Sequence, residues 1–115
     1  MPAERLDGVI HQQTRLQILA ALYRNGRVSF TDLRDGLRLT GGNVATHTAR
    51  LEEAGYLRSE RALTRSGFEV QYVLTARGSD AFESYLAELR AMLEAAGVDG
   101  FPRKQAGGPS ATEPS

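Results

Sequence analysis

Four polar side chains near the middle of the chain have types and a spacing that suit contact with the edges of nucleic-acid bases. Asn43, Thr46, His47 and Arg50 repeat at i, i+3, i+4 and i+7, so a helix would place them in one stripe. Arginine suits guanine edges, asparagine suits adenine, and a threonine methyl can meet a thymine methyl. The pattern predicts a helix that contacts bases, and the alternative is that these side chains are solvated on an exposed face.

The helix that carries this polar stripe is expected to run from Gly41 to about Ala54. Thr40 is placed to cap its start, and Gly55 terminates it. Gly42 leaves little side chain where backbone N–H groups favour an anion such as a phosphate. A second, apolar stripe lies roughly 110° around the helix from the polar one, so it can dock the helix on the rest of the domain. This apolar stripe consists of Val44, Thr48 and Leu51.

The remaining elements follow from changes in hydrophobic period and from capping residues. The helices are expected at Ala3–Ile10, from Gln12 or Thr14 to Arg24, from a cap at Thr31 to about Arg38, and at Ala76–Ala96 after a cap at Thr75. The strands are expected at Tyr56–Arg61 and Glu69–Leu74, joined by a loop over Ala62–Phe68, with Arg27–Phe30 as the edge of a small sheet. Two short helices followed by a hairpin describe a helix-turn-helix with a wing.

Short motifs in this order resemble those of winged helix-turn-helix bacterial transcriptional regulators of the MarR-like and ArsR-like kind. The motifs are Gly42-Asn43-Val44, the run LEEAGYL over 51–57, and Leu74-Thr75-x-x-Gly78. The resemblance covers roughly residues 6 to 94. It implies a mainly α (α+β) winged helix-turn-helix with a two-stranded wing and a long C-terminal dimerisation helix. Two departures are Thr48, where relatives have Leu or Ile, and a wing without a Pro-Arg-rich tip.

The function implied by the resemblance is sequence-specific binding of double-stranded DNA by a homodimer, with repression preferred to activation. Arg65 at the wing tip could lie along phosphates or enter the minor groove, and Arg61 is a phosphate contact or an ion-pair partner of a neighbouring glutamate. The predicted DNA-binding residues are Thr40, Gly42, Asn43, Thr46, His47, Arg50, Arg61 and Arg65.

The first and last helices carry more apolar side chains than one helix stripe needs, which favours a symmetric dimer. Symmetry then predicts a palindromic operator with half-sites about one helical turn apart. The alternative is that all these side chains pack within the protomer's own core. The predicted dimerisation residues are Leu6, Ile10, Leu19, Phe82, Tyr85, Leu86, Leu89, Met92 and Leu93.

A formal net charge of zero over 115 residues hides two segments of opposite sign. Nine arginines face six carboxylates between Arg24 and Arg77, a balance of +3, whereas Gly78–Gly97 has a balance of −3. The basic part coincides with the predicted helix-turn-helix and wing, so neutrality does not argue against DNA.

Composition narrows the function classes further. With no cysteine and two histidines that do not cluster, we expect no metal site and no cofactor. No arrangement of catalytic residues is visible, so we expect that the protein is not an enzyme. We also expect it to be cytoplasmic and to have no membrane segment. We expect residues 1–96 to form the domain and residues 97–115, which hold three of the four prolines, to form a disordered tail.

Two other functions remain open from the sequence alone. One is a winged helix used as a protein-interaction module. The other is a regulator with a small-molecule pocket at the dimer interface, although no effector is identified. That pocket would be lined by Tyr23, Phe82, Tyr85 and Met92.

Overall fold

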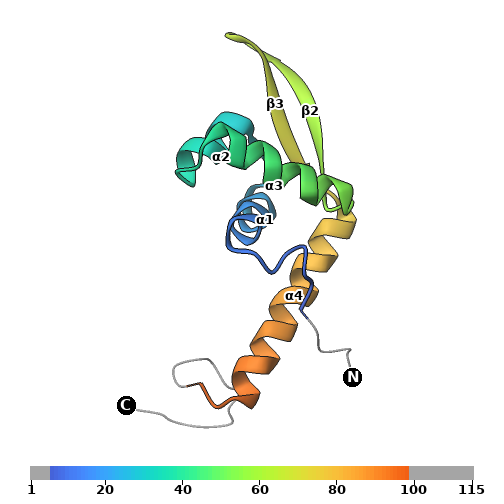
Figure 1. Cartoon of the computed structure of the whole chain (residues 1–115). Coiled ribbons are helices and arrows are strands. Elements are labelled where there is room, and N and C mark those ends of the chain that lie inside the picture. The colour runs from blue at the N-terminus through green and yellow to red at the C-terminus, as the bar shows by residue number, and fades with distance from the viewer. Residues whose placement is uncertain (1–5, 99–115) are drawn as a thin grey trace, which may run out of the picture.

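The computed structural model describes residues 6–98, in which the helices gather at one end of a small antiparallel sheet (Figure 1). The predicted residues beyond this range, including most of the 97–115 tail, lie outside the described part. The elements in chain order are α1 Gln13–Asn25, β1 Arg27–Ser29, α2 Phe30–Gly36, α3 Gly41–Glu53, β2 Leu57–Thr64, β3 Gly67–Leu74 and α4 Ala76–Ala95. This order confirms the predicted winged helix-turn-helix.

The sheet has the order β1-β3-β2 with antiparallel neighbours, and its two long strands form the wing. The wing extends well away from the helices (Figure 1). Arg27 pairs with Val73, so the short strand β1 joins the sheet at the base of the hairpin. The two strands of the wing therefore have no third strand beside them near the tip, where both faces are open.

The wing is longer than the sequence predicted, and the loop expected over Ala62–Phe68 is wrong. Strand pairing continues to Thr64 opposite Gly67, so only two residues separate the strands. Gly67 has φ +111°, which a residue with a Cβ rarely adopts, and it allows the chain to reverse this tightly. The Thr64 hydroxyl donates to the Gly67 carbonyl at 2.7 Å and further fixes the turn.

The helix boundaries follow the predicted caps with one exception. The Thr40 hydroxyl accepts from the Asn43 N–H at 3.0 Å, and α3 starts where the sequence predicted. The predicted cap at Thr31 is wrong, because the Ser29 hydroxyl accepts from the Asp32 N–H at 3.0 Å and α2 begins at Phe30. A three-residue strand leading directly into the helix leaves Ser29 in the extended conformation that a cap requires.

The segment before α1 forms turns, so the predicted helix over Ala3–Ile10 is wrong for its described part, Leu6–Ile10. The Asp7 carboxylate accepts from the Val9 and Ile10 N–H groups, which holds the chain in a local turn. Ile10 is fully buried in spite of the irregular backbone. The spacing of apolar residues had predicted the buried side correctly but not the conformation.

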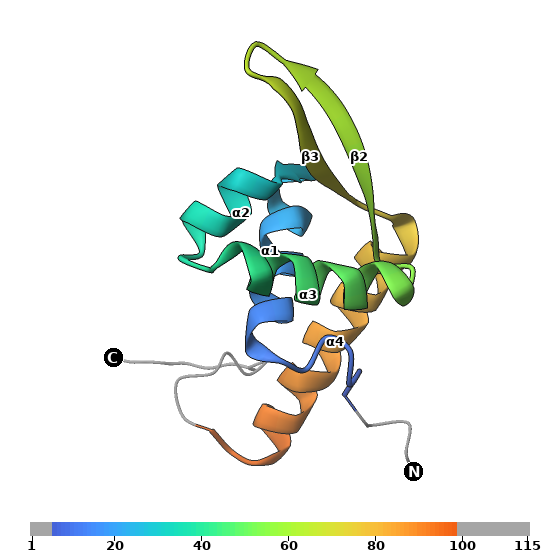
Figure 2. The same cartoon turned by 45° about the horizontal axis from the view of Figure 1, so that its top comes forward.

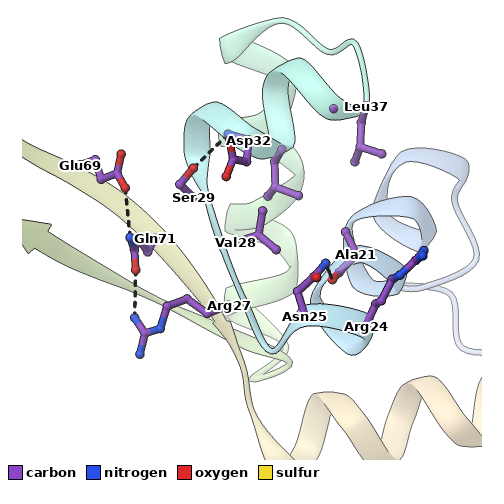
Figure 3. Close-up of a pocket in the computed structure, with 12 residues that line it drawn as sticks. Ala21, Arg24, Asn25, Arg27, Val28, Ser29, Asp32, Leu37, Glu69 and Gln71 are labelled. Carbon is purple, nitrogen blue, oxygen red and sulfur yellow. Dashed lines mark hydrogen bonds between the residues drawn. The ribbon is translucent and has the colours of Figure 1, made fainter. Parts of the chain in front are cut away.

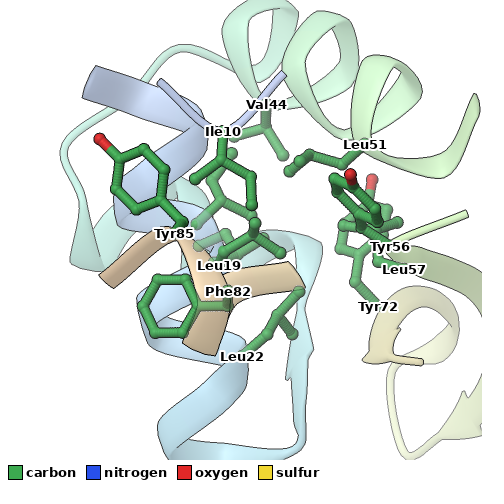
Figure 4. Packing of buried hydrophobic residues seen from close by; sticks show 12 residues of the cluster. Ile10, Leu19, Leu22, Val44, Leu51, Tyr56, Leu57, Tyr72, Phe82 and Tyr85 are labelled. Atoms are coloured by element: carbon green, nitrogen blue, oxygen red, sulfur yellow. The ribbon is translucent and has the colours of Figure 1, made fainter. Parts of the chain in front are cut away.

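The core lies where α1, α3 and α4 meet the base of the sheet (Figure 4). Thr48 lies in this core with 3% of its surface exposed, and its hydroxyl donates to the Val44 carbonyl at 2.7 Å. This bond satisfies the buried hydroxyl and explains how a threonine is accommodated on the apolar stripe of α3. The fully buried large side chains are Ile10, Ile18, Leu19, Leu22, Leu33, Val44, Leu51 and Leu57.

The junction between the sheet and α4 fixes three elements at one point. The Thr75 hydroxyl accepts from the Gly78 N–H at 2.9 Å and donates to the Gly55 carbonyl at 2.6 Å, so the cap of α4 also binds the end of α3. Gly78 is buried directly against the Tyr56 carbonyl, and a Cβ there would overlap it. The close approach of α4 to this turn therefore requires glycine.

We predict that Gly78→Ala lowers the free energy of unfolding by about 3 kcal/mol or more, because backbone atoms cannot move aside as a flexible side chain would. Gly36→Ala in α2 is the matched control: a Cβ there meets nothing within 4 Å, so we expect stabilisation of about 0.5 kcal/mol. Urea unfolding followed by circular dichroism measures both. Equal midpoints for Gly78→Ala and the parent would contradict the close packing.

Candidate nucleic-acid interface

Helix α3 has the two stripes that the sequence predicted. The side chains of Val44, Thr48 and Leu51 are buried. On the neighbouring face of the helix, Asn43, Thr46 and Arg50 are exposed. The structure therefore places these three predicted base contacts on one open face of a helix that is firmly docked by its other face.

Arg50 has a weak partner within its own helix. Its Nη1 lies 3.6 Å from Glu53 Oε1, and both side chains are more than half exposed. Exposed ion pairs of this kind stabilise a helix by only a few tenths of a kcal/mol. Arg50 can therefore exchange Glu53 for a stronger bidentate partner at little cost.

The start of α3 is open at the backbone. A Cβ on Gly42 would meet only the Thr40 hydroxyl, at 4.0 Å, so packing within the protein does not demand glycine there. Thr40 and Gly42 are both exposed. Small residues at this helix terminus leave its N–H groups approachable by a phosphate.

His47 differs from the rest of the polar stripe. Its side chain is partly buried, and Nδ1 lies 3.3 Å from Nη1 of Arg15, a residue of α1 that the sequence analysis did not single out. Arg15 is itself held by a 2.6 Å bond from Nε to the Val9 carbonyl. Partial burial is the main cause that lowers the pKa of His47 below its ordinary value, and the Arg15 charge lowers it further. His47 is therefore neutral at neutral pH and lies at the edge of the exposed face.

The wing contributes two exposed arginines. Arg65 lies in the turn itself, and Arg61 lies on β2 with its guanidinium carbon 4.6 Å from the centre of the Phe68 ring. Neither has an ion pair with any residue of the 6–98 range. Arg58 is different, because it and Arg27 both bind Glu60, and these bonds lower the pKa of that carboxyl.

The predicted dimerisation residues divide into two groups. Ile10, Leu19, Phe82 and Tyr85 are buried within the protomer, so its own core accounts for them. Leu86 and Met92 are exposed at 42% and 47%, while the remaining three are partly buried. These three are Leu6, Leu89 and Leu93. The lower half of α4, which carries most of this second group, extends beyond the other helices (Figure 2).

The side chains predicted to line an effector pocket at the dimer interface differ in exposure, and Tyr23 and Met92 are exposed at 44% and 47%. Phe82 and Tyr85 are buried, and the Tyr23 ring lies 5.0 Å from that of Phe82. Tyr85 also bonds to His11 Nδ1 at 2.8 Å, an interaction that the sequence did not indicate.

A surface hollow of about 750 Å³ lies elsewhere, between the end of α1, β1 and α2 (Figure 3). Charged and polar side chains from distant segments surround it, including Arg24, Asp32 and Glu69. It contains none of the predicted DNA contacts. Only the fold brings Glu69 and Gln71 of β3 beside the contiguous segment from α1 to α2, which is why the sequence analysis did not find this hollow.

Two further properties of the described residues concern metal binding and membranes. In the 6–98 range, no group of three or more His, Cys, Asp or Glu side chains is arranged to hold a metal ion. Among the helices of the same range, none is long and apolar enough to cross a membrane.

Comparison with known proteins agrees with this geometry. Residues 14–93 match the family described as winged helix DNA-binding domain. The uncharacterized protein MJ0432 of Methanocaldococcus jannaschii is 30% identical over 81 residues, which cover 70% of this chain and 88% of that protein.

Solved structures share the fold. The transcriptional regulator homologue protein from Pyrococcus horikoshii OT3 superposes with a TM-score of 0.73 at 22% identity, covering 76% of this chain and 87% of its own. The antimony-specific transcriptional repressor AntR has a TM-score of 0.58 at 26% identity, covering 77% and 75%.

The chain therefore belongs to the winged helix DNA-binding domain family. It has the winged helix-turn-helix fold of a DNA-binding domain, as the motifs around Gly42 and Gly55 predicted.

We predict that Arg15→Gln raises the pKa of His47 part of the way toward its ordinary value of about 6.5, since burial continues to lower it. Because the folded-state pKa of His47 is lowered, the unfolded chain protonates this imidazole at a higher pH than the folded chain does. His47 therefore lowers stability as the pH falls from about 6.5 toward its depressed folded pKa. NMR titration of the imidazole C–H signals measures the shift, with Arg24→Gln on the far end of α1 as control. An unchanged His47 titration in Arg15→Gln would show that this neighbour has no electrostatic effect.

Proposed function

We propose that this protein is a homodimeric, sequence-specific transcriptional repressor that binds a palindromic operator through α3. The observation that carries the proposal is the division of α3 into a buried stripe and an exposed stripe of Asn43, Thr46 and Arg50. A helix docked on one face and polar on the other is what major-groove readout requires. Repression is preferred to activation because a bound dimer can act by occupying the promoter.

The direct contacts are divided among the elements by their position. Asn43, Thr46 and Arg50 contact base edges, whereas His47 contributes from the margin of the face as a neutral group. Thr40 and Gly42 lie at the helix start and approach a phosphate. Arg61 and Arg65 of the wing contact the backbone or the minor groove.

The exposed apolar residues of α4 support a second protomer on this helix. Leu86 and Met92 are exposed on a half-helix that extends beyond the body, and an exposed apolar strip of this kind is stabilised when a second copy covers it. The symmetric pairing of two α4 helices would present two α3 helices on one side. Two half-sites about 34 Å apart, one turn of DNA, are then engaged together.

The charge distribution favours binding that needs both half-sites. The balance of +3 over Arg24–Arg77 is small for a DNA-binding surface, and the −3 of the α4 segment repels phosphates. Affinity of one protomer for arbitrary DNA should therefore be modest and sensitive to salt. Linking two modest sites in a dimer raises the total affinity without new contacts.

Selection of bound duplexes from a random library tests the proposal. We expect a palindromic consensus, and we expect Arg50→Ala to relax the preference at one base pair in each half-site, costing about 1–3 kcal/mol there. Arg24→Ala removes the same charge from a face that α3 does not share, and it should keep the full consensus. Recovery of no consensus by the parent would overturn the proposal. A protein-interaction module would instead pass through a duplex-DNA column at low salt.

The dimer is tested independently of DNA. Leu86→Glu together with Met92→Glu should place two charges in the apolar contact and shift the protein from dimer to monomer, with an affinity loss for the palindrome of at least 100-fold, about 2.7 kcal/mol. Ala91→Glu, on the outward face of the same helix, is the control and should remain dimeric. Sedimentation equilibrium measures both. A parent that sediments as a monomer at micromolar concentration would contradict this assembly.

A further inference from the structure

The tip of the wing carries large apolar side chains that the fold does not use. Leu63 and Phe68 are 74% and 64% exposed, and they lie directly opposite one another on β2 and β3. Val70 follows on the same face, opposite Arg61, and is 37% exposed. Burial of large apolar side chains stabilises a fold, so leaving this pair in water indicates another role.

This apolar face of the wing looks toward the side of α3. Side chains alternate across a strand, so Leu63 shares its face with Ser59 and with the core residue Leu57. The Ser59 hydroxyl lies 3.3 Å from the Glu52 carboxylate at the end of α3. The face that forms the core at the base of the wing therefore continues to the tip, beyond the part that α3 covers.

Positive charge surrounds the apolar pair. The Arg61 guanidinium stacks over the Phe68 ring at 4.6 Å, an arrangement that holds both groups in place, and Arg65 projects from the adjacent turn. Within residues 6–98 neither arginine forms an ion pair. DNA has anionic phosphates on the outside and aromatic bases on the inside. An apolar pair flanked by two arginines complements both parts.

Resting on the DNA-binding function proposed above, we propose that Phe68 and Leu63 form a wedge that enters the minor groove and partly unstacks a base step. Arg61 and Arg65 bind the phosphates on either side. The two-residue turn makes this geometry accessible, because Phe68 lies next to Gly67 and only Arg65 and Ser66 separate the strands. Apolar wedges of this kind kink and unwind the duplex, and steps that unstack readily, such as TA and CA, are favoured. The wing thus selects sequence by deformability as well as anchoring the protein.

The test separates unstacking from simple attraction. Relaxation of a supercoiled plasmid by topoisomerase in the presence of the parent should leave a changed linking number, because each inserted wedge unwinds the duplex. Phe68→Ala and Leu63→Ala should leave it unchanged, while Phe68→Leu restores most of the effect. Val70→Ala, on the same face but farther from the tip, is the control and should unwind like the parent. All three positions are exposed, so thermal unfolding of the four variants should match that of the parent.

Affinity for a duplex recovered by selection gives a second readout. Phe68→Ala should bind about tenfold more weakly with the same dependence on salt, because it removes stacking and no charge. Arg65→Ala should instead lower the slope of log affinity against log salt by about one. If Phe68→Ala and Arg65→Ala both alter only the salt dependence of the affinity, the wedge is overturned.

Other outcomes assign the patch differently. A parent that binds the selected duplex without changing the linking number refutes the wedge and leaves the proposed function standing. Unwinding without any selected consensus refutes sequence-specific regulation and leaves the wedge. If Phe68→Ala changes the sedimenting mass of the free protein, the patch is a contact between copies of this chain and the wedge is refuted.

Discussion

The arrangement of every functional surface depends on the hydrogen-bonded junction between the end of α3 and the start of α4. There the Thr75 hydroxyl bridges the Gly55 carbonyl and the Gly78 N–H, and the Thr75 N–H donates to the Tyr56 carbonyl at 3.2 Å. The Tyr56 hydroxyl binds Asp7, and burial, followed by this bond, raises the pKa of Tyr56 to about 12. One small cluster thus fixes the recognition helix, the base of the wing and the long C-terminal helix relative to one another.

Rigid placement at this junction matters because the proposed contacts are spread over separate elements. The exposed stripe of α3 and the tip of the wing can engage adjacent grooves only if their separation is constant. The wing reinforces this requirement, since its strands run from the junction to the turn at Arg65 and Ser66 without a break in pairing. By contrast, the half of α4 that carries the exposed Leu86 and Met92 extends beyond the other helices, and there we propose that a second protomer binds (Figure 2).

The sequence indicated most of α3 correctly because helix periodicity and capping are local. The spacing of Val44, Thr48 and Leu51 predicted the buried stripe, and Thr40 and Gly55 predicted the limits of the helix, all of which the structure confirms. Predictions based on a single residue type were less secure. The turn at Asp7 and the cap at Ser29 differ from expectation, since a carboxylate or a hydroxyl can bond its own backbone in several ways.

By itself, the sequence determined the class of fold, the recognition helix and the basic character of the segment around it, because these follow from spacings of a few residues. Only the tertiary structure decided which apolar residues remain exposed. Phe82 and Tyr85 are buried in the core, whereas Leu63 and Phe68 are exposed, although both pairs look equally apolar in the sequence. It also placed Arg15 beside His47, 32 positions away in the chain. Exposure and electrostatic neighbours depend on contacts between distant segments, and no local pattern contains them.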